Sequence, residues 1–357
     1  MIVAFRVDAA TIIGSGHVMR CLALAQALKL CGHECIFVCR LHSGHLNEHI
    51  AALGFQVISL PAANEPEMFI DTWLGCSWQE DAQQTLSALQ NMPIDWLVVD
   101  HYAIDQQWEN IFACSKLKLL VIDDLANRRH QASLLLNQNL GAQTSDYSGT
   151  VSHECLLCLG PDYALLRYEF RHWRAKSLSL RLNQPTQLNR LLISFGGTDP
   201  HNATGKTLMR LSHTDLPLHT QIRVLLSQRA PAYTQVKTQL KNLPWRVELL
   251  SDVNNMAVLM SESDLCIGAA GGSSWERACL GLPSLLTAIA DNQHSALKHL
   301  TEHQAALAFN LNDTSLVEQI HQVLQQPTIL TECAKQSSQL CDGMGCQRVI
   351  QMMQQCH

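Results

Sequence analysis

The sequence predicts an α/β protein in which two Rossmann-like, doubly wound domains face each other across a cleft. The chain has 357 residues, and a single hydrophobic core stops growing at about 250–300 residues. Hydrophobic residues make up 47% of the chain and charged residues 16%, a composition that supplies buried cores and excludes a disordered chain. Apolar runs of strand length alternate with segments of helical periodicity throughout, which is typical of βαβ units and parallel sheets.

The apolar runs form two series, and each series is expected to be one sheet. They are nearly continuous in apolar residues, as strands covered by helices on both faces must be. The first series comprises residues 2–7, 34–39, 56–60, 96–100, 118–123, 134–137 and 154–157. The second comprises residues 190–195, 221–226, 246–250, 265–268, 283–286 and 305–309.

A polar segment separates the two series. Residues 170–187 are charged and polar and contain a proline, so we expect the end of a helix followed by an interdomain linker. The boundary is placed near Asn183, which gives an N-terminal domain of residues 1–183 and a C-terminal domain of residues 184–357. Ligands of such sheets bind beyond the carboxyl ends of the strands, so those ends are expected to line the cleft.

The charge balance and the segment types restrict partners and location. The 31 acidic and 25 basic residues give a formal net charge of −6, which argues against binding to nucleic acid polymers. The N-terminal residues lack a basic region followed by an apolar stretch, so no signal peptide is expected. No window holds about 18 uninterrupted apolar residues, so no membrane span is expected. We therefore expect a cytoplasmic protein with no membrane partner.

The 14 cysteines and 17 histidines raise the question of disulfides and metals. Thiols stay reduced in the cytoplasm, and the cysteines are scattered, Cys114 among them. Cys35 and Cys39 flank an apolar run and should behave as small buried hydrophobes. Only Cys155 and Cys158 have C-x-x-C spacing, without a second pair at zinc-ribbon distance. The histidines show no metal-binding spacing, so we expect no metal.

A glycine-containing loop follows the first expected strand. Gly14 and Gly16 allow a tight turn and a close approach of the backbone to a ligand. The loop leads into an amphipathic helix, whose free N-terminal N–H groups attract anions. A dinucleotide fingerprint requires a third glycine where Met19 stands, so NAD is disfavoured.

His17 lies at the first turn of that helix. A helix N-terminus favours the neutral imidazole, which is the form that can act as a general base. The loop by itself equally allows a histidine that only caps the helix. The expected strands ending at Asp100 and at Asp123 carry further polar residues, which could face the cleft or cap helices.

Two more glycine loops lie in the second half. Gly196 and Gly197 follow the strand at 190–195 and could lie under a phosphate or a sugar, with a helix beginning near Asn202. The segment 268–278 places small residues and two serines before a helix, which makes a better phosphate cradle because bare N–H groups, hydroxyls and the helix dipole converge there.

Glu276 lies about one turn inside the helix that follows this second loop. Its carboxylate could accept hydrogen bonds from both hydroxyls of a ribose. Alternatively, Ser273 and Glu276 could form a capping box, since S-x-x-E is the signature of that motif.

Several of these segments together resemble a known family. The opening FRVDAATIIGSGHVMRCLALA, with VVDHY, ISFGGTD and GGSSWE, resembles the UDP-sugar hydrolases of pseudaminic acid biosynthesis, a pathway of surface glycan modification. These are relatives of the MurG-type N-acetylglucosaminyltransferases and share their GT-B fold. The run YALLRYEF before the linker is similar as well. The resemblance extends from residue 2 to about 310, and the rest resembles a helical tail that in GT-B folds packs back on the N-terminal domain.

The resemblance implies a reaction and a set of site residues. The family hydrolyses UDP-2,4-diacetamido-2,4,6-trideoxy-β-L-altropyranose, with water attacking the anomeric carbon and UDP leaving with inversion. It implies that His17 is catalytic, that Tyr102 assists beside the sugar, and that the GGSSWE loop holds UDP. The expected substrate or UDP contacts are Gly14, Gly16, Arg20, Asp100, Gly196, Gly197, Gly271, Gly272, Ser273, Glu276, Asn292 and Gln293.

The implied chemistry agrees with the residues present. UDP is a good leaving group, so one base suffices and the carboxylate pair of ordinary glycosidases is not needed. Helix N-termini can stabilise the departing charge, so we expect neither a metal nor a cofactor. The chain is longer than compact family members, and the excess lies in residues 61–79, residues 138–152 and the C-terminal tail.

Two alternatives to the hydrolase remain. A glycosyltransferase of the same fold would pass the sugar to an acceptor hydroxyl, and a MurG-like one would need an apolar and basic patch facing the membrane. Residues 17–30 and 41–53 lack clustered Lys and Arg, which favours the hydrolase. A non-catalytic nucleotide-sugar binding protein is disfavoured by His17 and Arg20 in the first loop. The expected partner is a UDP-sugar, and the chain is expected to be a monomer, with a weak dimer as the alternative.

Overall fold

The computed structural model describes the whole chain except residues 63, 68, 114–116, 184–186, 252 and 357. The chain divides into two compact units. The N-terminal unit comprises Met1–Arg167 and Met344–His357, and the C-terminal unit comprises Tyr168–Gly343. Cys114 and part of the expected linker, 184–186, lie outside the described residues.

The N-terminal unit contains one parallel sheet in the order β3-β2-β1-β4-β5-β6-β7. Its strands are β1 (Ile2–Val7), β2 (Glu34–Arg40), β3 (Gln56–Leu60), β4 (Trp96–Asp100), β5 (Lys118–Ile122), β6 (Leu134–Asn137) and β7 (Leu156–Leu159). Its helices are α1 (Gly16–Leu30), α2 (Asn47–Ala52), α3 (Trp78–Leu89), α4 (Gln106–Glu109) and α13 (Gly345–Gln355), with short 3₁₀ turns η1 (Ile70–Thr72), η2 (Thr144–Tyr147) and η3 (Pro161–Tyr163).

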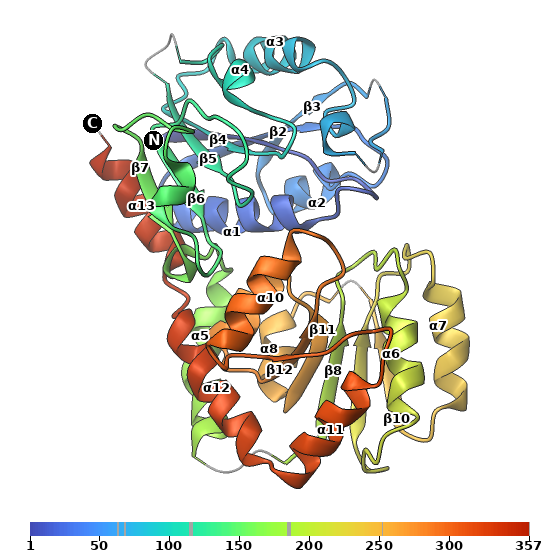
Figure 1. Cartoon of the computed structure of the whole chain (residues 1–357). Helices are drawn as coiled ribbons and strands as arrows, with labels where there is room; N and C mark the ends of the chain where they lie inside the picture. The colour runs from blue at the N-terminus through green and yellow to red at the C-terminus, as the bar shows by residue number, and fades with distance from the viewer. Residues whose placement is uncertain (63, 68, 114–116, 184–186, 252, 357) are drawn as a thin grey trace. The chain divides into compact units, whose positions relative to one another are not determined.

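Both faces of this sheet are covered, which explains the continuous apolar runs. Figure 1 shows α1 and α2 on one side of the sheet and α3 and α4 on the other. Alternate residues of β1 enter separate cores: Phe5 packs with α1, whereas Ala4 packs with Trp108 of α4. Val349 of α13 is buried in the first of these cores, and α13 contacts α1. The last helix therefore belongs to the N-terminal unit.

The C-terminal unit contains a second parallel sheet in the order β10-β9-β8-β11-β12-β13. Its strands are β8 (Arg190–Ser194), β9 (Gln221–Leu225), β10 (Arg246–Leu250), β11 (Leu265–Ala269), β12 (Ser284–Thr287) and β13 (Leu307–Ala308). Its helices are α5 (Tyr168–Leu182), α6 (Ala203–Leu211), α7 (Tyr233–Gln239), α8 (Met256–Glu262), α9 (Ser273–Cys279), α10 (Gln293–Glu302), α11 (Ser315–Gln325) and α12 (Thr328–Leu340), with the 3₁₀ turn η4 (Leu240–Asn242).

The division between the units falls between Arg167 and Tyr168, earlier than the boundary placed near Asn183. The reason is that α5 packs on α8, α9 and α12 of the C-terminal unit. The hydroxyl of Ser177 donates to the carbonyl of Leu280 at 2.7 Å, and buried Arg181 donates to the carbonyls of Met260 and Ser263. This helix was expected to end the first domain, because the helices on which it packs are far away in the chain.

Two strands, β7 and β13, differ by more than one residue at an end from the expected runs. β7 begins at Leu156 instead of residue 154, and β13 is limited to Leu307–Ala308 instead of residues 305–309. β13 lies at the edge of its sheet and pairs only with β12, through two residue pairs. An edge strand with one neighbour has fewer ladder hydrogen bonds to define its length than the central strands.

Each sheet contains a point at which the strand order reverses. In the N-terminal unit β1 and β4 are neighbours, with Val7 opposite Asp100. In the C-terminal unit β8 and β11 are neighbours, with Ser194 opposite Gly268. A Cβ at Gly268 would lie 2.3 Å from the carbonyl oxygen of Ser194, so only glycine fits. The loops that leave such strand pairs frame the crevice in which α/β proteins bind ligands.

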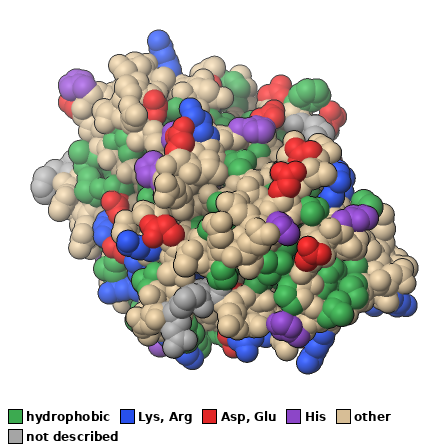
Figure 2. All heavy atoms as spheres, turned by 60° about the horizontal axis from the view of Figure 1, so that its bottom comes forward, with side chains coloured by type: hydrophobic (Ala, Val, Ile, Leu, Met, Phe, Trp, Pro, Cys, Tyr) green, Lys and Arg blue, Asp and Glu red, His purple; other side chains and the backbone are tan. Residues whose placement is uncertain are grey.

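Surface and thiol features are consistent with the composition. On the face shown in Figure 2, Lys and Arg side chains are interspersed with Asp and Glu. No helix within the described part of the chain is long and apolar enough to cross a membrane. Cys35 and Cys39 are buried in the N-terminal unit, which confirms their predicted packing role.

Candidate active site

His17 lies where the first strand leads into the first helix. Gly14 has a φ of +81°, a conformation that favours glycine, and its turn ends at Ser15, the N-cap of α1. His17 is 8% exposed, and its Nδ1 lies 2.6 Å from Oδ1 of Asp100. A carboxylate only accepts, so Nδ1 is the donor, and in the neutral ring the lone pair resides on Nε2. Pairing with Asp100, rather than helix capping, therefore accounts for the orientation of this ring.

Asp100 ends β4 and is fully buried. It accepts hydrogen bonds from Arg20 through Nε at 2.6 Å and through Nη2 at 2.7 Å. Burial by itself would raise the pKa of Asp100, but the charge of Arg20 and the contact with His17 outweigh it and hold that pKa well below its usual value. Asp100 and Arg20 are paired with each other and hold the His17 ring. Their expected contact with substrate remains a prediction.

Tyr102 follows Asp100 by two residues and contacts the ring of His17. The ring centroids are 4.6 Å apart, and the planes are nearly perpendicular at 86°. Burial, together with the carboxylate of Asp124, raises the pKa of Tyr102, so its phenol stays protonated. Asp124 also accepts a hydrogen bond from Arg20 at 3.1 Å. The predicted catalytic residues His17 and Tyr102 therefore lie together, and both are next to the ion pairs that Arg20 makes.

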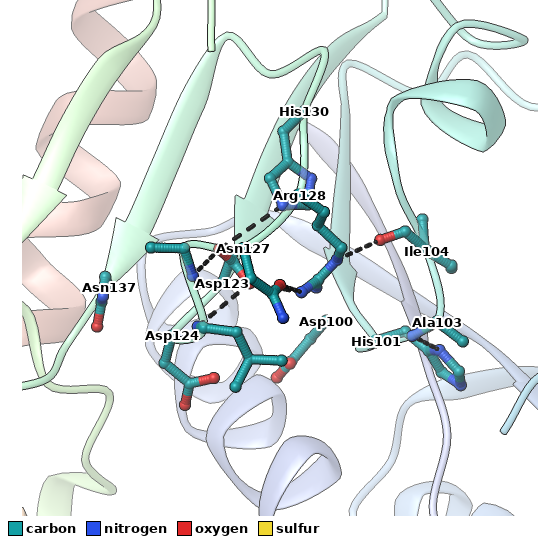
Figure 3. A network of polar contacts seen from close by, with 12 residues as sticks. Asp100, His101, Ala103, Ile104, Asp123, Asp124, Asn127, Arg128, His130 and Asn137 are labelled. Atoms are coloured by element: carbon teal, nitrogen blue, oxygen red, sulfur yellow. Dashed lines mark hydrogen bonds and ion pairs between the residues drawn. The ribbon is translucent and has the colours of Figure 1, made fainter. Parts of the chain in front are cut away.

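A second network fixes the loop that carries Asp124. Figure 3 shows Asp123, Asp124 and Arg128 in the turn after β5. Arg128 pairs with Asp123 at 2.9 Å and donates to the carbonyl of Ile104 at 2.9 Å, which joins this turn to the loop after β4. His130 is buried between Asp123 and Glu109. Burial opposes its protonation, but those two carboxylates outweigh it and raise its pKa to about 9. Asp123 therefore has a structural role.

A third charged cluster lies under the ends of β1 and β2. Arg6 contacts Asp8 at 2.7 Å and Asp81 at 2.6 Å, and Arg40 contacts Asp81 at 2.6 Å. All four of these side chains have no solvent exposure. His101, the neighbour of Asp100, has its Nε2 3.4 Å from Oδ2 of Asp8. The cluster anchors the strand ends from which the His17 and Tyr102 loops depart.

The predicted phosphate loop of the C-terminal unit has a buried arginine beneath it. Arg277 is 2% exposed and donates to the hydroxyls of Ser273 and Ser274 at 2.9 Å each and to the carbonyl of Ala269 at 2.8 Å. Sequence reasoning missed this residue. The available signal was its spacing. Arg277 follows Ser274 by three positions and Ser273 by four, and residues at these spacings lie on the same side of a helix. Its charge adds to the attraction of this loop for anions.

The helix that follows this loop does not begin as the capping-box alternative requires. Through 272–276, all of which the structure describes, α9 has Gly272 as its N-cap and no side-chain capping hydrogen bond. Ser273 is thus the first helical residue instead of the cap. Glu276 is half-buried in the first turn, and the ribose interpretation of this carboxylate remains a prediction.

Two other predicted contacts have clear positions in the C-terminal unit. Nε2 of Gln293 would lie 3.5 Å from a Cβ placed on Gly271, so the amide and the loop are neighbours. Gln293 is held by the N–H of Ile289, which donates to its Oε1 at 3.0 Å, and Asn292 is the N-cap of α10.

The glycines of three predicted loops have open space around them. Gly196 has a φ of +95°. A Cβ on Gly14, Gly16, Gly196, Gly197 or Gly272 would meet nothing within 4 Å. Their backbones could therefore be approached by a ligand.

The predicted site residues thus form two sets. His17, Arg20, Asp100 and Tyr102 are in mutual contact in the N-terminal unit, and the phosphate-loop residues with Gln293 belong to the C-terminal unit. Among the side chains that the structure describes, no three His, Cys, Asp or Glu residues could together hold a metal ion.

Two Rossmann-like units with these crevices define the GT-B fold, which confirms the predicted fold class. The chain is similar to the crystal structure of Acinetobacter baumannii MurG, with a TM-score of 0.69, 15% identity and 99% of each chain covered. It is also similar to the UDP-GlcNAc 2-epimerase of Neisseria meningitidis bound to UDP-GlcNAc, with a TM-score of 0.65, 12% identity and 99% of each chain covered. Likenesses at this identity concern the fold.

Similarity in sequence narrows the class of protein further than similarity in fold. The model of the glycosyltransferase family 28 C-terminal domain matches residues 194–345. The chain is 28% identical over 268 residues to the UDP-2,4-diacetamido-2,4,6-trideoxy-beta-L-altropyranose hydrolase of Campylobacter jejuni, covering 75% of this chain and 84% of that protein.

Two further relatives are considerably longer than the matched region. An uncharacterized protein of Methanocaldococcus jannaschii is 27% identical, with 79% of this chain and 54% of that protein covered. The spore coat polysaccharide biosynthesis protein SpsG of Bacillus subtilis is 25% identical, with 55% of this chain and 57% of that protein covered. The chain therefore spans about half the length of these two relatives.

Proposed function

We propose that this protein is an enzyme that hydrolyses a UDP-linked amino sugar, with UDP-2,4-diacetamido-2,4,6-trideoxy-β-L-altropyranose as its substrate. The observation that carries the proposal is the pairing of His17 with Asp100 at 2.6 Å, beside Tyr102. This pairing leaves the lone pair on Nε2, and among the residues that the structure describes this nitrogen has no hydrogen-bond partner. The similarity to the Campylobacter jejuni hydrolase supports the choice of substrate.

In the proposed mechanism His17 acts as a general base. A water molecule attacks the anomeric carbon while Nε2 of His17 takes its proton. The bond between the anomeric carbon and the phosphate oxygen breaks, and its electron pair leaves with UDP, so the configuration inverts. Asp100 keeps Nδ1 protonated and stabilises the imidazolium that forms, as the carboxylate does in a catalytic triad. Tyr102 lies beside the sugar.

The nucleotide is assigned to the C-terminal unit. Gly271, Gly272 and Ser273 would meet the diphosphate, and the charge of Arg277 beneath the loop would favour the anion and the departing UDP. Glu276 would accept hydrogen bonds from the ribose, with Asn292 and Gln293 close to the loop. The proposal keeps the expectations of a cytoplasmic monomer that needs no metal, so a chelator should leave turnover unchanged.

A glycosyltransferase of the same fold is the second candidate, and the match to a glycosyltransferase family 28 domain favours it. The loop 61–77 argues for the hydrolase. Its exposed apolar residues, Phe69 and Ile70, are accompanied by Glu65, Glu67 and Asp71. Acidic neighbours repel the anionic membrane surface from which a lipid-linked acceptor would be taken.

The decisive experiment is product analysis in ¹⁸O-labelled water without an acceptor. Hydrolysis at the anomeric carbon predicts free sugar that carries the label and unlabelled UDP. Label in UDP would mean attack at phosphorus, and intact substrate despite binding would mean that the protein is not a hydrolase. Turnover that appears only after an acceptor alcohol is added would establish the transferase.

Changing Asp100 to Asn should lower kcat by roughly 10²–10⁴-fold with little change in the affinity for UDP. The amide keeps the shape but can donate to Nδ1, which stabilises the wrong tautomer of His17 and leaves Nε2 protonated. Steady-state kinetics and calorimetric UDP binding check this. Asp105→Asn is the matched control in the next loop, because Asp105 caps α4 and asparagine caps equally well. A kcat for Asp100→Asn equal to that of the control would rule out the positioning role.

Changing Glu276 to Ala should weaken UDP binding by about 1–3 kcal/mol, or roughly 5- to 150-fold in Kd, through loss of charged hydrogen bonds to the ribose. Isothermal titration calorimetry with UDP measures it. Glu302→Ala on the surface of α10 is the control and should bind UDP like the wild type. An unchanged Kd for Glu276→Ala, whatever its thermal stability, would remove this carboxylate from the nucleotide site.

A further inference from the structure

Trp73 is an aromatic residue beside the proposed base that neither the motifs nor the relatives single out. It follows η1 in the loop 61–77, between β3 and α3. Its ring stacks on Tyr102, with centroids 5.6 Å apart and planes at 26°. It also lies edge-on to His17 at 6.4 Å and 80°. Trp73, Tyr102 and His17 form what we call the aromatic wall.

The loop holds Trp73 in place through its own hydrogen bonds. The indole Nε1 donates to the carbonyl of Glu67 at 3.2 Å, and the N–H of Trp73 donates to the carbonyl of Ile70 at 3.1 Å. Gly75 closes the loop: its φ is +68°, and a Cβ there would lie 2.5 Å from the carbonyl oxygen of Asn64. Leu74, which lies between Trp73 and Gly75, is 2% exposed, and its burial ties the loop to the core.

The polar atoms of the Trp73 and Tyr102 rings already have partners within the protein. The indole N–H of Trp73 is taken by Glu67, and the phenol of Tyr102 interacts with Asp124. The ring of Trp73 is nevertheless only half-buried. The ring therefore offers a ligand an aromatic surface. Such a surface binds C–H groups of the ligand well, whereas a ligand hydroxyl buried against it would have no hydrogen-bond partner.

We propose that Trp73 is a specificity-determining residue whose ring receives a methyl-bearing edge of the sugar, either a deoxy carbon or the methyl of an acetamido group. This inference rests on the proposed function, because it assumes that the sugar lies at His17. It gives the extra length of the loop 61–77 a role in substrate choice. A sugar with a hydroxymethyl group at that edge would be disfavoured by roughly tenfold or more, since its hydroxyl would lose water and gain no hydrogen bond.

Saturation-transfer NMR of the free sugar with UDP tests the contact without turnover. The probe is 2,4-diacetamido-2,4,6-trideoxyaltrose with saturating UDP. In the wild type, one methyl signal should receive the strongest saturation, and the C6 doublet and acetyl singlets reveal which methyl it is. Trp73→Ala should lose that preference, whereas Trp73→Phe and the control Phe69→Ala should keep it. Phe69 belongs to the same loop and is 70% exposed. Equal saturation of all protons in the wild type, or an unchanged pattern in Trp73→Ala, would overturn the proposal.

Kinetics with the full UDP-sugar separate substrate contact from mere support of Tyr102. Trp73→Ala should raise KM about tenfold with a smaller change in kcat, and Trp73→Phe should recover most of the loss. A fall in kcat with unchanged KM would show that Trp73 only holds the rings of Tyr102 and His17 in position. If the wild type releases no UDP but the NMR pattern holds and depends on Trp73, hydrolysis is wrong and the sugar contact stands.

Discussion

Replacing His17 with alanine is expected to lower kcat by about 10²–10⁴-fold, which is what a positioned general base contributes. Within the aromatic wall, the imidazole of His17 is the group that can accept a proton. Its Nδ1 is bound to the buried carboxylate of Asp100 at 2.6 Å, and this leaves Nε2 as the acceptor. The affinity for UDP should stay within about twofold, because the nucleotide is assigned to the other unit. UDP release, followed in a coupled assay, measures the change.

Two comparisons make this result specific. His49→Ala removes an exposed histidine from α2 and should turn over like the wild type. Added imidazole should restore part of the activity of His17→Ala, because it can fill the space left by the ring and accept the proton. If His17→Ala retains more than about a tenth of the wild-type kcat, the base is another residue.

Replacing Asp81 with alanine is expected to destabilise the N-terminal unit by about 3–5 kcal/mol. This carboxylate is fully buried and accepts hydrogen bonds from Arg6 at 3.1 and 2.6 Å, from Arg40 at 2.6 Å and from the indole of Trp108 at 3.0 Å. Its loss leaves the buried guanidinium of Arg6 with Asp8 as its carboxylate partner and removes the carboxylate that pairs with the buried guanidinium of Arg40. Thermal unfolding should show Tm lowered by about 6–20 °C.

The same carboxylate predicts an acid dependence. Burial opposes the ionisation of Asp81, but the charge and hydrogen bonds of Arg6 outweigh it and lower its pKa. A lowered folded-state pKa means that the stabilisation is fully present above the unfolded value of about 4 and is lost as pH falls through the folded value. The Tm difference between wild type and Asp81→Ala should therefore be constant near neutral pH and shrink below about pH 4.

Glu48→Ala provides the surface control for Asp81. Glu48 is exposed in the first turn of α2, and its loss should change Tm little. A similar Tm for Asp81→Ala and Glu48→Ala would mean that the cluster of Arg6, Arg40 and Asp81 does not anchor the strand ends.

The sequence was sufficient where a signal repeats locally. A strand buried on both faces is a continuous apolar run, so β1, β3, β4, β6 and β10 have the predicted bounds. The N-cap at Asn202 and the glycine turn before His17 are likewise set by short segments, because backbone φ values and N-terminal N–H groups are local properties. The domain boundary failed for the opposite reason: the partners of α5 are provided by α8, α9 and α12.

The sequence by itself determined the two parallel sheets, the glycine loops and the presence of a histidine at the start of α1. Only the tertiary structure decided which side chains meet. Asp100 and His17 are 83 residues apart in the chain and meet because β1 and β4 are neighbours where the strand order reverses. Trp73 meets Tyr102 in the same way, through loops that follow two different strands. Pairing across a sheet depends on which strands lie side by side, and a local pattern of residues does not encode that order.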